Sequence, residues 1–96
     1  MAHTEVDVNQ FVVALGDNGQ LVDVREPDEV AAGMLPGAVN IPMSGFVDRI
    51  AELDPDRPVV LVCRSGQRSG RVAEYLAGNG FTEVVNLTGG MLGYSG

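Results

Sequence analysis

Residues 58–71, with the sequence PVVLVCRSGQRSGR, carry the clearest structural signal in the chain. The segment 58–62 is apolar at every position, which is typical of a parallel strand buried on both faces. It is followed by Cys63, the only cysteine among 96 residues. Polar residues then lead into a helical pattern over residues 69–80. The stretch therefore predicts a central strand, a polar loop that begins with a thiol, and a helix.

The rest of the chain repeats this alternation of strand and helix patterns. The other strand patterns fall at residues 4–8, 20–25, 38–42 and 82–87. The other helical patterns fall at residues 8–15, 28–32, 44–53 and 89–92. Such alternation predicts one α/β domain over residues 1–96, with a mostly parallel five-stranded sheet and helices on both faces.

Local signals also give expectations about single residues in these helices. We expect Asp7, Ser44 and Ser69 to cap the helices that follow them, because their side chains can accept hydrogen bonds from free backbone N–H groups. Val12 and Val47 fall on helix faces that we expect to point inward.

Composition limits the class of protein. An apolar content of 45% in 96 residues suits one domain with its own core. A single cysteine cannot form an intramolecular disulfide, no secretory signal pattern is visible, and no apolar run is long enough for a membrane helix. We therefore expect a soluble cytoplasmic protein. A net charge of −7 argues against binding to nucleic acid or to anionic membranes.

Several types of active site are excluded by what the sequence lacks. The only histidine is His3, close to the start of the chain, whereas Cys–His and Ser–His–Asp sites need a fixed imidazole. One cysteine and one histidine are too few for a zinc site. The glycine-rich motifs of dinucleotide and P-loop folds are also missing. We therefore expect no metal and no cofactor.

The loop after Cys63 has three features that favour a thiolate over a thiol. A strand-to-helix turn directs successive backbone N–H groups into an anion-binding concavity. The helix that follows offers the positive end of its dipole. Arg64, Arg68 and Arg71 lie within eight positions of the thiol, in a chain that has 13 acidic and 6 basic residues. Because ligands of parallel sheets bind at the carboxyl ends of the strands, Cys63 is the expected reactive residue.

Asp23 and Arg25 end the strand pattern 20–25 and are expected at the same edge of the sheet. They form either a structural ion pair or helix-entry contact, or part of the site. In the second case Arg25 adds positive charge to the rim and Asp23 orients a loop group.

Four segments together resemble the single-domain rhodaneses, which are thiosulfate sulfurtransferases. They read DVREP, LPGAVNIP, CRSGQRS and GFTEVVNLTGGM, in the family's order, and the resemblance covers about residues 4–92. It implies a rhodanese-like fold in which Cys63 is the nucleophile and carries a sulfur atom as a persulfide. The residues implied to bind substrate are Arg64, Ser65, Gly66, Gln67 and Arg68, with Arg71 in a supporting role.

The resemblance also implies the substrates. A small anionic sulfur donor such as thiosulfate would be attracted by Arg64 and Arg68. The acceptor would be cyanide, a thiol or a protein. Two positions depart from the family pattern: Met34 replaces a frequent histidine, and Tyr94 stands near a frequent tryptophan. We expect Met34 to pack, and a short final helix to leave the loop less covered.

Other functions remain open at this point. Phosphatases and arsenate reductases use a related loop with arginine six positions after the cysteine, where this chain has Ser69. A rhodanese-like module without catalysis could bind or regulate a partner. The persulfide itself could also serve sulfur relay in cofactor or tRNA thiolation, or the detoxification of sulfide.

Overall fold

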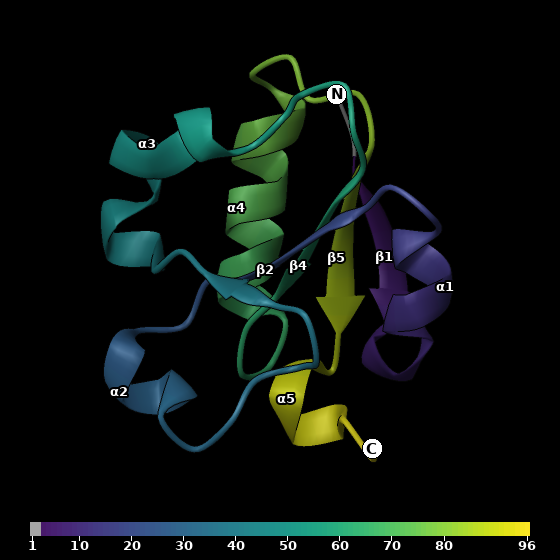
Figure 1. Cartoon of the computed structure of the whole chain (residues 1–96), viewed down its shortest axis with the longest axis vertical. Coiled ribbons are helices and arrows are strands. Elements are labelled where there is room, and N and C mark those ends of the chain that lie inside the picture. Colours follow the sequence, from purple (N-terminus) through teal and green to yellow (C-terminus); the bar gives the residue numbers. More distant parts are fainter. Residues whose placement is uncertain (1–2) are drawn as a thin grey trace.

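A five-stranded sheet forms the centre of the protein, which a computed structural model describes over residues 3–96 (Figure 1). The strands are β1 (Thr4–Asp7), β2 (Gln20–Asp23), β3 (Val39–Asn40), β4 (Val59–Val62) and β5 (Val84–Thr88). Their order across the sheet is β1-β5-β4-β2-β3, and every pairing is parallel. The predicted α/β class and strand number are confirmed, and the sheet is parallel throughout.

Helices cover both faces of this sheet. They are α1 (Phe11–Leu15), α2 (Pro27–Val30), α3 (Phe46–Arg49), α4 (Gln67–Ala77) and α5 (Gly90–Gly93). Short 3₁₀ turns precede or follow two of them: η1 (Val8–Gln10), η2 (Met43–Gly45) and η3 (Ile50–Glu52). Residues of α3 and α4 belong to one apolar core, and residues of α1 and the α5 region belong to the other.

Strand β4 is buried between the two cores. Val59 and Leu61 belong to the core under α4, whereas Val60 and Val62 belong to the core under α1. All four side chains are fully buried, and burial of one such side chain stabilises the fold by about 1.5–3 kcal/mol. The strand that leads to Cys63 is therefore held firmly from both sides.

Two expectations about helix faces are wrong. Val12 is 67% exposed and Val47 is 62% exposed. Both follow a 3₁₀ turn, which has three residues per turn and so rotates the next side chains away from the face that a regular α-helix would bury.

The expectations about helix caps are partly wrong too. Asp7 accepts a hydrogen bond from Asn9 N, as a cap does, but Ser44 and Ser69 lie inside η2 and α4.

Helix α5, close to the C-terminus, binds the backbone of the loop that begins at Cys63. The backbone N–H of Met91 donates to the carbonyl oxygen of Cys63 at 2.9 Å, and that of Leu92 donates to the carbonyl of Arg64 at 3.0 Å. Gly90 makes this approach possible, because a Cβ atom there would lie 2.5 Å from those two carbonyl oxygens. The short final helix was expected, but its contact with the loop was not.

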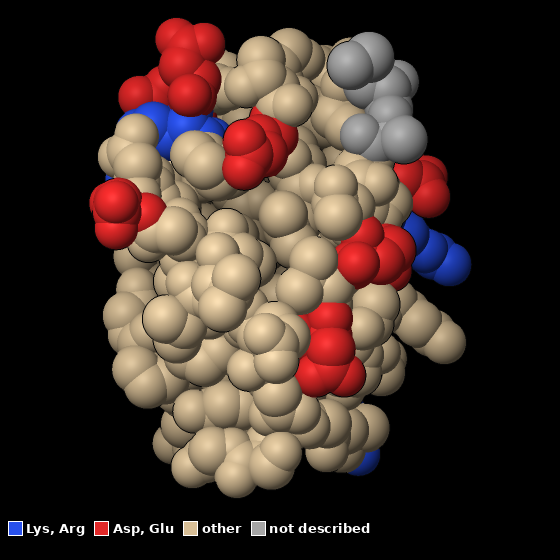
Figure 2. Space-filling view, turned by 90° about the vertical axis from the view of Figure 1, so that its right-hand side faces the viewer, with Lys and Arg blue, Asp and Glu red and all other residues tan. Residues whose placement is uncertain are grey.

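The surface is mostly uncharged or acidic where it is seen in Figure 2. On the face that carries α1 and β1, acidic side chains lie in separate groups, and the few basic ones in view form no patch. Within residues 3–96, no helix combines the length and the apolar character that crossing a membrane requires.

Replacing Gly90 by alanine should destabilise the fold through the α5 contact. The added Cβ clashes with backbone atoms and the residue keeps a φ of +56°, so we expect a loss of about 2 kcal/mol or more in the free energy of unfolding, measured with urea. Gly93→Ala is the matched control, because its Cβ would make an ordinary contact 3.6 Å from Val8. Equal stability of the two variants would contradict this account of α5.

Candidate active site

Cys63 is the first residue after β4, at the carboxyl edge of the sheet. The chain turns sharply there, and α4 begins only four residues later with Gly66 as its N-cap. Gly66 has a φ of +96°, a conformation that costs a residue with a side chain more than it costs glycine. A Cβ there would make an ordinary contact, 3.4 Å from the carbonyl oxygen of Leu87 in β5, so the backbone conformation rather than lack of space is the reason for glycine. A glycine is therefore required for this turn.

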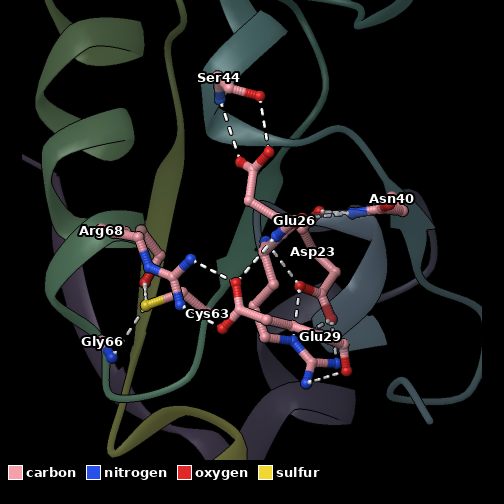
Figure 3. A network of polar contacts seen from close by, with 10 residues as sticks. Asp23, Glu26, Glu29, Asn40, Ser44, Cys63, Gly66 and Arg68 are labelled. Atoms are coloured by element: carbon pink, nitrogen blue, oxygen red, sulfur yellow. Dashed lines mark hydrogen bonds and ion pairs between the residues drawn. The ribbon is translucent and has the colours of Figure 1, made fainter. Parts of the chain in front are cut away.

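Two groups donate hydrogen bonds to the sulfur of Cys63 (Figure 3). The backbone N–H of Gly66 lies 3.1 Å from Sγ, and the hydroxyl Oγ of Ser69 lies 3.2 Å from Sγ. Ser69 is fully buried in the first turn of α4. Both donors stabilise a negative charge on sulfur more than they stabilise a neutral thiol.

These hydrogen bonds decide the ionisation of Cys63. Burial is the largest single effect and would raise the pKa of the thiol. The hydroxyl of Ser69 and the backbone N–H groups of Ser69, Gly66 and Ser65 together outweigh it, so that the pKa lies below its ordinary value. The thiolate is thus favoured mainly by uncharged donors of the loop rather than by the arginines that the sequence pointed to.

The loop also has N–H groups without an acceptor. Among residues 3–96, no atom accepts the backbone N–H of Gln67 or Arg68. Such groups at the start of an eleven-residue helix form a site for a negatively charged atom. The loop can therefore hold an additional anionic atom next to Sγ.

Arg68 is bound to a carboxylate of the facing helix. Its Nη1 and Nη2 lie 2.6 and 2.8 Å from the two carboxylate oxygens of Glu29 in α2 (Figure 3). These hydrogen bonds raise the pKa of Arg68 against the opposing effect of its burial, and the nearby charge of Cys63 adds to the rise. The guanidinium thus joins α2 to α4 beside the sulfur, and its charge is balanced by Glu29.

Glu29 is fixed in turn by its own helix. Its carboxylate accepts from the backbone N–H of Glu26 at 3.0 Å, and Glu26 accepts in return from the N–H of Glu29, as in a capping box. The hydrogen bonds to Arg68 and Glu26 lower the pKa of Glu29 to about 2. This carboxylate is therefore ionised at every pH near neutrality.

Asp23 and Arg25 form the structural ion pair that was one of the two expectations for them. Nη2 of Arg25 lies 2.8 Å from Oδ2 of Asp23, and both side chains are buried. Arg25 also donates to the carbonyl oxygens of Glu29 and Gly33, at 3.4 and 2.7 Å. The pair holds α2 and the turn after it in place, and so supports the site indirectly through Glu29.

The other two arginines of the loop region are not bound to the sulfur. Arg64 is exposed, and its side chain has no hydrogen-bond or ion-pair partner within residues 3–96. Arg71 lines an apolar pocket of about 200 Å³ between α3 and α4. The other residues that line this pocket are Met43, Phe46, Val47, Val72 and Tyr75.

Two positions depart from the family pattern, Met34 and Tyr94. Met34 was expected to pack, and it is only partly covered, with 39% of its surface exposed. Tyr94 makes an edge-to-face contact with Phe11 of α1, with ring centroids 5.9 Å apart. His3 contacts Glu5, and residues 3–96 contain no cluster of three or more potential metal ligands.

Three residues near the sulfur were not predicted. Ser69 was interpreted as a cap, although its place six positions after Cys63 could have indicated a contact with the loop. Glu29 comes from another part of the chain, and no local spacing connects it to Arg68. Asn86 in β5 donates to the carbonyl of Gly66 at 3.0 Å, and the only signal for it was a polar residue within an apolar strand.

The pairing of Glu29 with Arg68 should make stability depend on pH. Because folding lowers the pKa of Glu29 from 4.5 to about 2, its stabilising effect is complete above pH 4.5 and is lost as the pH falls toward 2. Glu29→Gln should therefore unfold at a lower temperature than the wild-type protein at neutral pH, and the difference should shrink in acid. Glu52→Gln, which breaks the exposed pair of Glu52 with Arg49, should have a smaller effect. A constant difference for Glu29→Gln at all pH values would contradict this.

Comparison with known proteins gives one family from sequence and from structure. The chain matches the family model described as Rhodanese-like domain over residues 7–96. It is 48% identical over 77 residues to Uncharacterized protein YqhL of Bacillus subtilis, covering 80% of this chain and 61% of that relative. It is 40% identical over 93 residues to a protein named Sulfurtransferase of Allochromatium vinosum, covering 95% of this chain and 87% of that relative.

The solved structures agree with this match. A rhodanese-like domain protein from Staphylococcus aureus aligns with a TM-score of 0.86 and 33% identity, covering 96% of this chain and 91% of that structure. The family that the sequence motifs suggested is confirmed: the protein belongs to the rhodanese-like domain family, which includes relatives named as sulfurtransferases.

Proposed function

We propose that the protein is a sulfurtransferase that carries one sulfane sulfur atom as a persulfide on Cys63. The observation that supports this most is the environment of Sγ, which accepts hydrogen bonds from Gly66 N and Ser69 Oγ beside loop N–H groups that have no acceptor. A thiolate is the reactive form of a cysteine nucleophile, and these donors favour it.

In the first half-reaction the thiolate attacks the outer sulfur of thiosulfate. A bond forms between Sγ and that sulfur, the S–S bond of thiosulfate breaks, and sulfite leaves with the bonding electrons. The product is a persulfide anion whose terminal sulfur carries the charge. We infer that the free N–H groups of Gln67 and Arg68 hold this atom together with the N–H of Ser65, with Arg64 attracting the anionic donor.

In the second half-reaction an acceptor removes the sulfur. Cyanide or a thiolate attacks the terminal sulfur, the S–S bond of the persulfide breaks, and the electron pair returns to Sγ as the thiolate. No general base takes part in the attack itself, because the nucleophile is the thiolate. Two steps that share one covalent intermediate predict ping-pong kinetics.

The reaction needs local movement around the sulfur. Cys63 is fully buried, so a donor reaches Sγ only when side chains beside the loop shift. We place the reaction in the cytoplasm, where a lone thiol stays reduced. A protein acceptor would serve sulfur relay, and cyanide or a small thiol would serve detoxification.

The phosphatase or arsenate reductase alternative is less well supported. Such a loop uses an arginine to hold a tetrahedral oxyanion, but here the sixth position after the cysteine is Ser69, whose hydroxyl is bound to Sγ. Arg68, one position earlier, has both ends of its guanidinium on Glu29. A non-catalytic binding module would not need the lowered pKa of Cys63.

Incubation with thiosulfate followed by intact mass spectrometry tests the proposal. We expect the wild-type protein to gain the mass of one sulfur atom and to lose it when cyanide is added, because Cys63 forms and then releases a persulfide. Cys63→Ala should show no gain. Absence of the gain in folded wild-type protein with thiosulfate, and with a polysulfide as a second donor, would contradict sulfur transfer and favour a binding module.

A further inference from the structure

Asn86 is an unusual residue for its position in β5. Its neighbours Val84, Val85 and Leu87 are buried apolar side chains, and Asn86 itself is 2% exposed. Burying a side-chain amide costs roughly 1–3 kcal/mol unless hydrogen bonds compensate. One of its polar atoms, Oδ1, has no hydrogen-bond partner. The contacts that Asn86 does make must therefore explain why this residue is present.

The amide nitrogen of Asn86 connects the sheet to the cysteine loop. Nδ2 donates to the carbonyl oxygen of Gly66 at 3.0 Å and to the carboxylate oxygens of Glu5 at 3.0 and 3.2 Å. A carboxylate only accepts hydrogen bonds, so the NH₂ end of the amide must face Glu5. The opposite orientation would place Oδ1 against two acceptors. Glu5, on the neighbouring strand β1, therefore fixes the orientation in which Asn86 donates to Gly66.

The bond to Gly66 also determines where the next N–H group points. In a trans peptide the carbonyl of one residue and the N–H of the next lie in one plane and point in opposite directions. No peptide bond within residues 3–96 is cis. Holding the Gly66 carbonyl toward β5 therefore directs the N–H of Gln67 away from β5, and this N–H is one of those without an acceptor.

Gly70 in α4 leaves room for the hydrogen bond between Asn86 and the Gly66 carbonyl. The N–H of Gly70 donates to the same Gly66 carbonyl at 3.1 Å. A Cβ at Gly70 would lie 3.3 Å from Nδ2 of Asn86, closer than most such contacts. The amide of Asn86 and the N–H of Gly70 thus both donate to the Gly66 carbonyl. Together they hold Gly66 in its left-handed conformation, in which its own N–H is directed at Sγ of Cys63.

We propose that Asn86, oriented by Glu5, is a positioning residue for the reaction of Cys63. It holds the peptide between Gly66 and Gln67 so that the N–H of Gly66 stabilises the thiolate and the N–H of Gln67 faces the transferred sulfur. The second half of this role rests on the proposed function, whereas the first half concerns the thiolate alone.

Asn86→Leu tests the proposal, because leucine is similar in size and cannot donate. We expect the pKa of Cys63 to rise by about half a unit or more, since one stabilising hydrogen bond becomes weaker. At a pH below the pKa of Cys63, the fraction of thiolate falls with this shift. We therefore also expect sulfur uptake from thiosulfate to be slower there, by about threefold or more. The pKa is measured without any donor, from the ultraviolet absorbance of the thiolate relative to Cys63→Ala, because the chain has one cysteine.

Gln20→Met is the matched control. The Gln20 side-chain amide bridges the backbone of Asp54, donating to its carbonyl at 2.9 Å and accepting from its N–H at 2.8 Å, at the start of β2. Its loss should lower stability and leave the pKa of Cys63 unchanged. A general effect of losing an amide contact would instead move the pKa in both variants and would overturn the proposal.

Glu5→Ala gives a second test that does not alter the buried strand position. Removing a negative charge would by itself lower the pKa of Cys63, whereas releasing Asn86 from its orientation should raise it. We expect a rise, and the proposal is overturned by a fall or no change, or by an unchanged pKa in folded Asn86→Leu. If the wild-type protein takes up no sulfur, the proposed function fails, and these pKa measurements still decide the role of Asn86.

Discussion

The hydrogen bond from the N–H of Gly66 to Sγ of Cys63 is the contact on which the site depends. It exists because Gly66 adopts a left-handed conformation at the N-cap of α4, with a φ of +96° that favours glycine. The strand before it is buried on both faces, and α5 binds the carbonyls of Cys63 and Arg64. The loop is thereby held at both ends, with the N–H of Gly66 directed at the sulfur.

Dipoles rather than free charges dominate the electrostatics of this site. Glu29 balances the charge of Arg68, and Asp23 balances that of Arg25. What remains beside the sulfur is a set of backbone N–H groups and one hydroxyl, which lower the pKa of Cys63 in spite of its burial. Such donors hold a fixed direction and need no reorganisation when negative charge moves from Sγ to a second sulfur atom.

The sequence predicted those parts of the structure that depend on local patterns. The apolar run of β4, the polar turn and the pattern of α4 placed Cys63 correctly at the edge of the sheet, and the motifs indicated the family. The contacts of Glu29 and Asn86 could not be predicted, because they join residues 39 and 20 positions apart and depend on how strands and helices pack. The pairing of Arg68 with Glu29 also means that its charge is balanced by a carboxylate, which no local pattern around Cys63 indicated.

The central claim is that the loop N–H groups stabilise the charged sulfur. Amide proton chemical shifts of Ser65, Gly66 and Ser69, followed by NMR while Cys63 ionises, test it most directly. The account predicts that the Gly66 signal moves most and that all three follow one titration, with a midpoint below the ordinary pKa of a thiol. Amide signals that do not follow the ionisation of Cys63, or a midpoint at or above the ordinary value, would contradict it.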